Sequence, residues 1–336
     1  MITASPAPAQ PAPLADWRQL WREAVTDARE LLALLGLEAL ASRLPPDDAG
    51  FALRVPRGFV ARMRPGDPRD PLLLQVLPQL AELDSAPGFV RDAVGDLGAR
   101  AAHGVLQKYA GRALLIASGS CAVNCRYCFR RHFPYTEEIA AAAHWREALA
   151  HLRTDASLSE VILSGGDPLS LSTPKLAELT DGLAAVPHVR RLRIHSRLPV
   201  VLPERVDGEF GAWLSGLGLQ KVVVLHANHP AEIDAGVAAA CERLRAAGAT
   251  LLNQSVLLRG VNDDEATLAA LSERLFAAGV LPYYLHQLDR VEGTAHFEVD
   301  DTRARALIEV LRARLPGYLV PRLVREVAGD PGKRPL

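Results

Sequence analysis

The chain has 336 residues, of which 49% are apolar and 23% charged, and its formal net charge is −1. These values are typical of a globular protein with a sizeable core, and they do not favour binding to nucleic acid or to an anionic membrane. No apolar run approaches the ~20 residues of a membrane span, and no signal peptide begins the chain, so we expect a cytoplasmic protein whose partners are small molecules.

The N-terminal part of the chain favours helices. Residues 1–15 are rich in Ala and Pro and predict a disordered tail. From residue 17 onward apolar residues recur with helical spacing, and the segments 51–66 and 72–95 also look mostly helical. We therefore interpret residues 16–100 as a helical N-terminal region that packs on the rest of the protein.

The sequence pattern changes near residue 100, where short apolar runs begin to alternate with amphipathic segments of helical length. Such units imply an α/β fold with parallel strands and right-handed crossovers. Six units are too few for a closed eightfold barrel, and an open, partial (β/α)6 barrel over residues 101–299 fits the count. The expected strands are Ala113–Ala117, Glu160–Leu163, Arg191–His195, Lys221–Leu225, Thr250–Val256 and Pro282–His286. The expected helices lie near 137–152, 173–185, 205–217, 231–247 and 263–278.

The C-terminal segment, residues 300–336, contains an expected helix near 301–314 and then the apolar strip Tyr318–Val327. In barrels of this kind the active site lies at the C-terminal ends of the strands. The first expected strand is followed directly by most of the cysteines of the chain.

Cys121, Cys125 and Cys128 form a C-x₃-C-x₂-C arrangement. Three thiolates can hold three irons of a 4Fe–4S cube and leave the fourth iron without a protein ligand. A structural zinc site completed by His132 is the alternative, although zinc sites usually pair two separated units. The remaining cysteine, Cys241, has no disulfide partner, which fits a reducing cytosol.

This spacing resembles the signature of the radical S-adenosylmethionine (SAM) enzymes. In that family the open iron holds SAM, and an electron from the cluster yields a 5′-deoxyadenosyl radical. Ser164–Leu169 (SGGDPL) follows one βα unit later, where the family has glycines that contact the cofactor. Glycines at a strand end let a ligand approach the backbone, although such a sequence is also typical of a simple tight turn. The resemblance assigns Gly165, Gly166 and Asp167 to cofactor binding.

Further motifs narrow the resemblance. They occur in the order CRYCFRR, SGGDPL, HSRLPVVLP, HANHP, NQSVLLRGVND and PYYLHQLD. In this order they resemble the lysine 2,3-aminomutase family, from about residue 100 to the C-terminus. The resemblance implies a 4Fe–4S cluster, SAM and pyridoxal phosphate (PLP) as cofactors. It also implies migration of the amino group of L-lysine from C2 to C3.

PLP enzymes need a lysine that binds the cofactor covalently. Lys333 ends the Gly/Pro-rich segment Gly329–Lys333, which matches the PLP-lysine segment of the family. A disordered basic tail is the alternative. The resemblance places the PLP phosphate contacts at Lys108, Tyr109, Arg112 and Gln254. Without it, the basic residues among these would be interpreted as a solvated face.

The substrate residues also follow from the resemblance. Arg130 matches the arginine that grips the amino acid carboxylate, a task suited to a guanidinium. A buried ammonium needs carboxylate partners, and the matching positions hold Asp289 and Glu326. Without the resemblance both would be solvated charges. His226 and His229 have two interpretations: they approach the cofactor, or they are packed or helix-capping histidines. Neither is therefore assigned a catalytic role.

The resemblance extends to the bacterial branch that supplies (R)-β-lysine to a ligase for the modification of elongation factor P. It implies a one-electron donor such as flavodoxin or ferredoxin. The chain stops three residues after Lys333, where the catabolic relatives continue into an oligomerisation segment, so we expect a monomer or weak dimer. Three alternatives stay open: a catabolic or osmolyte-producing aminomutase, a radical SAM enzyme without PLP, and a metal-stabilised binding protein.

Overall fold

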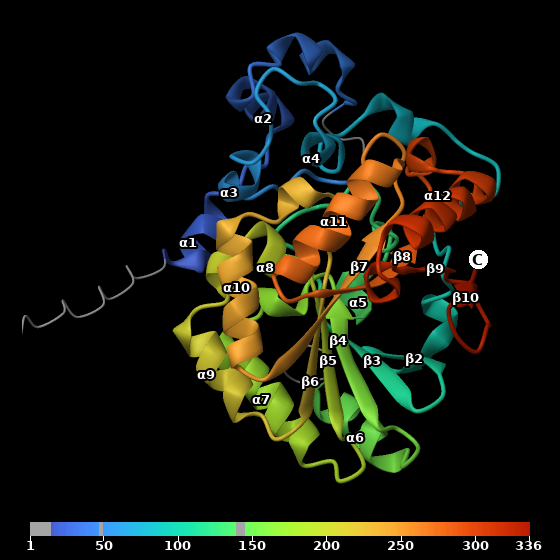
Figure 1. Ribbon diagram of the computed structural model, residues 1–336. Helices are drawn as coiled ribbons and strands as arrows, with labels where there is room; N and C mark the ends of the chain where they lie inside the picture. Colours follow the sequence, from blue (N-terminus) through green and yellow to red (C-terminus); the bar gives the residue numbers. More distant parts are fainter. Residues whose placement is uncertain (1–14, 47–49, 139–144) are drawn as a thin grey trace, which may run out of the picture.

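The computed structural model describes residues 15–46, 50–138 and 145–336, so the tail expected at 1–15 lies outside the described residues except for Ala15. Their strands form one sheet in sequence order, from β1 to β10 (Figure 1). Seven neighbouring strands of this sheet run parallel. They are β3 (Arg112–Ser118), β4 (Glu160–Gly165), β5 (Arg191–Ser196), β6 (Gln220–Leu225), β7 (Ala249–Val256), β8 (Leu281–His286) and β9 (Arg322–Arg325).

The strands at the two ends of this sheet are antiparallel to their neighbours. β1 (Arg100–Ala102) pairs with β2 (Val105–Tyr109), and β2 pairs with β3. At the other edge, β10 (Arg334–Pro335) pairs with β9. No pairing joins β1 to β10 within the described residues, so the sheet curves without closing.

The six strands predicted from the sequence correspond to β3–β8, and the prediction of a partial barrel is confirmed. β9 was expected only as an apolar strip, and the hairpin of β2 and β3 was not expected. That hairpin closes through Ala110 and Gly111, where Gly111 adopts a φ of +75° that other residues rarely tolerate.

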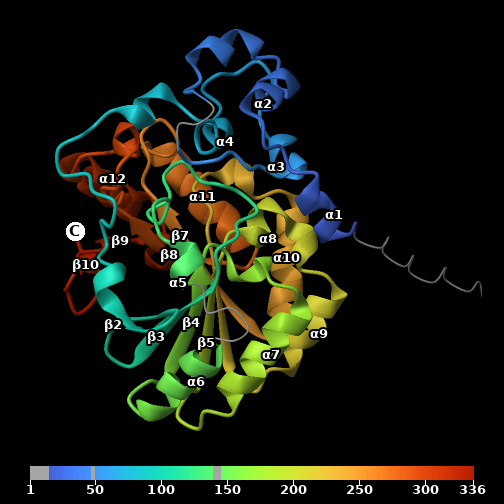
Figure 2. The same ribbon diagram turned by 180° about the vertical axis from the view of Figure 1, so that it is seen from behind.

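Helices cover the outer face of the parallel strands (Figures 1 and 2). The expected helices are present where the structure describes them, although residues 139–144 of the first lie outside the described part. The helices of the barrel are α5 (Tyr135–Glu138), α6 (Trp145–Thr154), α7 (Thr173–Ala184), α8 (Leu198–Val201), α9 (Gly208–Gly216), α10 (Ala235–Ala246), α11 (Glu265–Ala277) and α12 (Asp301–Arg314). Short 3-10 helices are η3 (Leu97–Ala99), η4 (Pro168–Ser170), η5 (Pro203–Arg205), η6 (Pro230–Glu232), η7 (Ala295–Phe297) and η8 (Gly317–Leu319).

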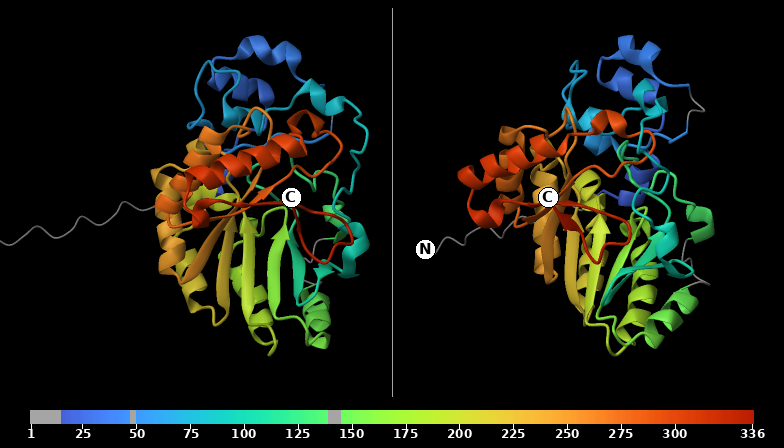
Figure 3. Two further views of the ribbon diagram at one scale, coloured as in Figure 1. Left: turned by 45° about the vertical axis from the view of Figure 1, so that its right-hand side comes forward. Right: turned by 90° about the vertical axis from the view of Figure 1, so that its right-hand side faces the viewer.

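The N-terminal region lies over the end of the barrel to which the strands point (Figure 3). It contains α1 (Trp17–Arg22), α2 (Ala28–Leu34), η1 (Glu38–Arg43), α3 (Arg57–Val60), α4 (Pro71–Leu74) and η2 (Leu80–Leu83). The expectation that 51–66 and 72–95 are mostly helical was wrong. In 72–95, Pro78 follows α4 and Pro87 follows η2, and a proline disfavours helical geometry at the residue before it.

One apolar core connects this region to the barrel. Phe59 and Leu72 are fully buried and belong to the same cluster as Leu163 and Leu198 of the barrel. Every residue of β4 is buried, as expected for a central parallel strand covered on both faces. Among the described residues, no helix has the length and apolar character needed to cross a membrane.

Candidate active site

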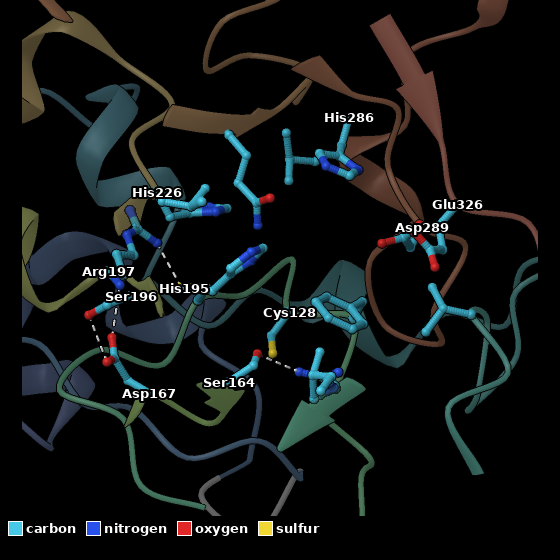
Figure 4. A pocket seen from close by; sticks show the side chains of 18 of the residues that line it. Cys128, Ser164, Asp167, His195, Ser196, Arg197, His226, His286, Asp289 and Glu326 are labelled. Atoms are coloured by element: carbon cyan, nitrogen blue, oxygen red, sulfur yellow. Dashed lines mark hydrogen bonds between the residues drawn. The ribbon is translucent and has the colours of Figure 1, made fainter. Parts of the chain in front are cut away.

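A cavity of about 290 Å³ lies at the C-terminal ends of the parallel strands (Figure 4). Every site residue predicted from the sequence lines it except Gly165. The lining therefore includes Cys121, Cys125, Cys128, Lys108, Tyr109, Arg112, Gly166, Asp167, Arg130, Gln254, Asp289, Glu326 and Lys333.

The three cysteines of the motif lie in the loop after β3, and each is partly buried. Burial, and after it the neighbouring Cys128, raises the pKa of Cys121 well above its ordinary value. Burial and Cys125 raise the pKa of Cys128 to about 11. Thiols that raise each other's pKa lie close together, and a bound cation would stabilise their thiolate forms.

The three thiols of this loop are compatible in number with the protein ligands of a 4Fe–4S cluster. Among the described residues, no three Cys, His, Asp or Glu side chains converge on a single-ion site. A 4Fe–4S cube does not require such convergence, because each thiolate bonds a different iron. His132, the fourth ligand of the zinc alternative, donates a hydrogen bond to the Glu292 carbonyl oxygen at 3.2 Å.

A buried arginine that the sequence analysis missed supports the cysteine loop. Arg197 Nη1 lies 2.7 Å from Cys125 Sγ and donates to the Tyr127 hydroxyl at 2.6 Å. Arg197 Nη2 donates to Gln75 Oε1 at 2.8 Å and to Glu232 Oε2 at 3.0 Å. Arg197 directly follows β5, and this position at a strand end was the feature of the sequence that could have identified it as a site residue.

The two glycines after β4 let the strand end approach the cysteine loop closely. A Cβ on Gly165 would lie 2.4 Å from the Ser118 carbonyl oxygen, and Gly165 has a φ of +119°. A Cβ on Gly166 would lie 2.7 Å from the Ser120 carbonyl oxygen. The Gly166 N–H donates to the Ser118 oxygen at 2.7 Å. These contacts give the glycines a structural role besides the predicted cofactor contact.

Gly165→Ala is expected to destabilise the protein by about 1–3 kcal/mol, because it combines backbone strain with a clash against main-chain atoms. We also expect a lower cluster content, since the displaced atoms belong to the loop that carries the cysteines. Urea unfolding and iron analysis check this. Gly211→Ala is the control, because a Cβ there meets nothing within 4 Å and Gly211 lies inside α9. An equal effect of both substitutions would contradict the argument.

The Asp167 carboxylate joins the loops after β4 and β5 (Figure 4). It accepts hydrogen bonds from the Ser196 hydroxyl at 2.7 Å and from the Arg197 and Leu198 N–H groups at 2.8 and 3.0 Å. Burial raises the pKa of Asp167 to about 6, although these hydrogen bonds favour the ionised form. Asp167 therefore holds the cavity wall together, and its cofactor contact stays a prediction.

Lys333 lies in an ordered loop, unlike the disordered tail of the alternative hypothesis, because the β9–β10 pair closes that loop. Lys333 Nζ donates to Glu326 Oε2 at 2.7 Å, and the Tyr109 hydroxyl donates to Glu326 Oε1 at 2.5 Å. Burial alone would raise the pKa of Glu326, but Lys333 and Tyr109 outweigh it and lower that pKa. Lys333 Nζ also lies 5.8 Å from the centre of the Tyr284 ring.

The residues around Lys333 fit a phosphorylated aromatic cofactor. Arg112 Nε is buried without a hydrogen-bond partner, and no described residue bonds the Gln254 amide. Both are free to donate to a phosphate. Lys108 is differently placed, since its Nζ lies 2.6 Å from Asp96 Oδ1 and 2.7 Å from the Val94 carbonyl oxygen. Its predicted phosphate contact would have to compete with these partners.

The predicted substrate residues lie around the same cavity. Arg130 is buried and donates from Nε to Asp96 Oδ2 at 2.6 Å and from Nη1 to Ser164 Oγ at 3.0 Å. Asp289 is partly buried, and no described residue donates a hydrogen bond to its carboxylate. Burial raises the pKa of Asp289 to about 7. Figure 4 shows Asp289 beside Glu326.

Three histidines lie between the Arg197 side and the Asp289 side of the cavity (Figure 4). The Nε2 atoms of His195 and His286 are buried without a partner, whereas His226 Nε2 lies 2.8 Å from the Tyr127 hydroxyl. Burial lowers the pKa of all three, that of His226 to about 3, so they are neutral at pH 7. His229 instead caps η6, where its Nδ1 accepts from the Ala231 N–H.

No protein-family model matches the sequence. The protein named L-lysine 2,3-aminomutase from Escherichia coli (strain K12) is 49% identical, over 96% of this chain and 94% of its own length. Proteins of the same name are 46% identical in Haemophilus influenzae, over 95% of this chain and 94% of theirs, and 32% identical in Clostridium subterminale, over 96% and 77%. A radical SAM methyltransferase structure from Sphaerobacter thermophilus is only remotely similar, with a TM-score of 0.47 and 20% identity over 66% of this chain and 68% of that chain. Since the similarity to the E. coli protein spans nearly both whole chains, the chain belongs to the L-lysine 2,3-aminomutase family.

Proposed function

We propose that this protein is an L-lysine 2,3-aminomutase, which converts L-α-lysine to (R)-β-lysine with a 4Fe–4S cluster, SAM and PLP. The observation that carries the proposal is the composition of one cavity. It brings three thiols together with Lys333 and with the carboxylates of Asp289 and Glu326. Family membership supports the isomerase activity. The C-x₃-C-x₂-C spacing of Cys121, Cys125 and Cys128 supports the cluster and SAM.

Different residues of the chain would bind the cluster, PLP and the substrate. When bound, the cluster and SAM supply a hydrogen-abstracting radical, and PLP supplies a π-system across which the nitrogen moves. The three thiolates would hold three irons and leave one free, and Lys333 would attach PLP. Arg130 would bind the substrate carboxylate, while Asp289 and Glu326 would receive the distal ammonium. The neutral histidines line the space between these groups.

Asp289→Ala is expected to weaken lysine binding by about 2–5 kcal/mol if the ion pair is fully desolvated, or roughly 30-fold to several thousand-fold. The reason is that the substrate ammonium loses a carboxylate that has no other partner. Steady-state kinetics with L-lysine measure the effect. Asp181→Ala is the control, because Asp181 is exposed on α7. Unchanged lysine kinetics for Asp289→Ala would place the ammonium elsewhere.

The raised pKa of Asp289 also predicts a pH dependence. Below about pH 7 the carboxyl is protonated and neutral, and above it the carboxylate can pair with an ammonium. The lysine side chain stays cationic throughout this range. The KM for L-lysine should therefore fall as the pH rises through 7, and Asp289→Asn should remove that fall. Charged neighbours that modulate this titration are Lys333, Glu326, Lys108 and Asp96. A fall that persists in Asp289→Asn would belong to another group.

The proposed activity is tested by anaerobic incubation of the reconstituted protein with L-lysine, SAM, PLP and dithionite, followed by chiral amino acid analysis. We expect (R)-β-lysine and dependence on each cofactor. Turnover without PLP would reject the PLP part, and zinc without acid-labile sulfide would reject the radical SAM part. A product of the opposite hand would correct the stereochemical part alone.

We further propose that the β-lysine is passed to a ligase that modifies elongation factor P in the cytoplasm, with flavodoxin or ferredoxin as electron donor. This role is supported by the motif resemblance, and a monomeric or weakly dimeric state stays a prediction. Intact-mass analysis of elongation factor P from a deletion strain tests the role. Retention of the full β-lysyl mass without a second aminomutase gene would favour a catabolic or osmolyte role.

A further inference from the structure

The Asp96 carboxylate lies between the two ends of the expected substrate site. It is 2% exposed, and it is 2.6 Å from Lys108 Nζ through Oδ1 and 2.6 Å from Arg130 Nε through Oδ2. Lys108 Nζ also lies 3.5 Å from Glu326 Oε1. Alternating charges therefore connect Arg130, expected to bind the substrate carboxylate, with Glu326, expected to bind the distal ammonium.

The backbone holds Asp96 in place from two sides. Asp92 accepts the Asp96 N–H at 2.9 Å and the Leu97 N–H at 3.0 Å. Gly95 has a φ of +67°, and a Cβ there would lie 2.9 Å from the Ala328 Cβ, in the loop after β9. The position of Asp96 is thus fixed by its own turn and by the loop that carries the C-terminal lysine.

These contacts restrain the Arg130 guanidinium. Its Nε is bound to Asp96 and its Nη1 to Ser164, whereas no described residue accepts from Nη2. A guanidinium held at two nitrogens keeps its free edge in one direction, as a carboxylate clamp requires. Burial alone would raise the pKa of Asp96, but Arg130 and Lys108 outweigh it and lower that pKa. Asp96 is therefore ionised and forms ion pairs with both cations.

We propose that Asp96 is a positioning residue that aims Arg130 at the substrate carboxylate. The inference rests on the proposed function and adds a specificity determinant to it. A residue that acts only on the carboxylate end should affect ligands with that carboxylate and spare ligands without it.

The test compares L-lysine with L-lysinamide, which keeps both amines and replaces the carboxylate by a neutral amide. In the reconstituted enzyme, Asp96→Asn should raise the KM for L-lysine by about tenfold to a hundredfold, with a smaller change in kcat. The inhibition constant of L-lysinamide should hardly change. Asp181→Asn, on the exposed face of α7, is the matched control. An equal change for both ligands, or no change for either, overturns the proposal.

Iron content and circular dichroism report whether Asp96→Asn folds. If it does not fold, Gly95→Ala decides, because it shifts the turn that carries Asp96 without replacing Asp96, Lys108, Arg130 or Glu326. The selective rise in KM should recur, and its absence overturns the proposal. A wild-type enzyme without lysine turnover would refute the proposed function and this inference together. An active wild type with an unselective variant refutes this inference alone.

Discussion

Replacing Cys121, Cys125 or Cys128 by alanine is expected to abolish turnover and to remove most of the cluster iron and sulfide. Each thiolate would supply one of three protein bonds to the cube. No other cysteine among the described residues lines the cavity, so none can substitute. Iron and sulfide analysis with electron paramagnetic resonance of the anaerobically reconstituted variants measures the loss independently of activity.

Cys241→Ala is the matched control for these variants. Cys241 lies in α10 with 0% exposure, and burial raises its pKa to about 11, so it is a neutral thiol packed in the core. Removing its sulfur should cost on the order of 1 kcal/mol of stability through the cavity that remains. Iron content and turnover should stay near the wild-type values. Comparable iron loss in Cys241→Ala would contradict the assignment of the cluster ligands.

Lys333→Ala is expected to abolish turnover by removing the amine that would attach PLP. In the wild type, borohydride reduction in the presence of PLP should label one peptide, and that peptide should contain Lys333. The substitution also leaves Glu326 without the ammonium that lies 2.7 Å away. Lys175→Ala, in an exposed position of α7, should keep both the label and the activity. A label at Lys108, or at no lysine, would reject the assignment.

The barrel could be predicted because buried parallel strands leave a local signal. β4 has no exposed residue, and such strands form apolar runs that stand out between amphipathic helices. The edge strands have no comparable signal. β10 has two exposed residues, one of them a proline, and it exists only because the chain returns beside β9. The prediction of long helices in the N-terminal segments was wrong for a related reason. Their apolar spacing suggested helices, but prolines interrupt them.

Some residues of the candidate site could likewise be predicted from the sequence, and others could not. The cysteines and glycines belong to short local motifs, so their spacing alone indicated where to look. The partners that hold them come from distant parts of the chain. Asp96 lies 34 residues from Arg130, and Arg197 lies 72 residues from Cys125, so only the fold brings each pair together. The groups that would bind ligands could be predicted from the sequence. The residues that orient those groups could be identified only in the structure.

The central claim is that the α-amino nitrogen of L-lysine moves from C2 to C3 of the same molecule. The most direct measurement uses L-lysine labelled with ¹⁵N at the α-amine and ¹³C at C3, incubated anaerobically with the reconstituted enzyme and followed by ¹³C NMR. We predict a new C3 signal split by one-bond coupling to ¹⁵N, which appears only with SAM and PLP present and is absent in the Cys128→Ala variant. Unchanged L-lysine, or a C3 signal without that coupling, would contradict the proposed function.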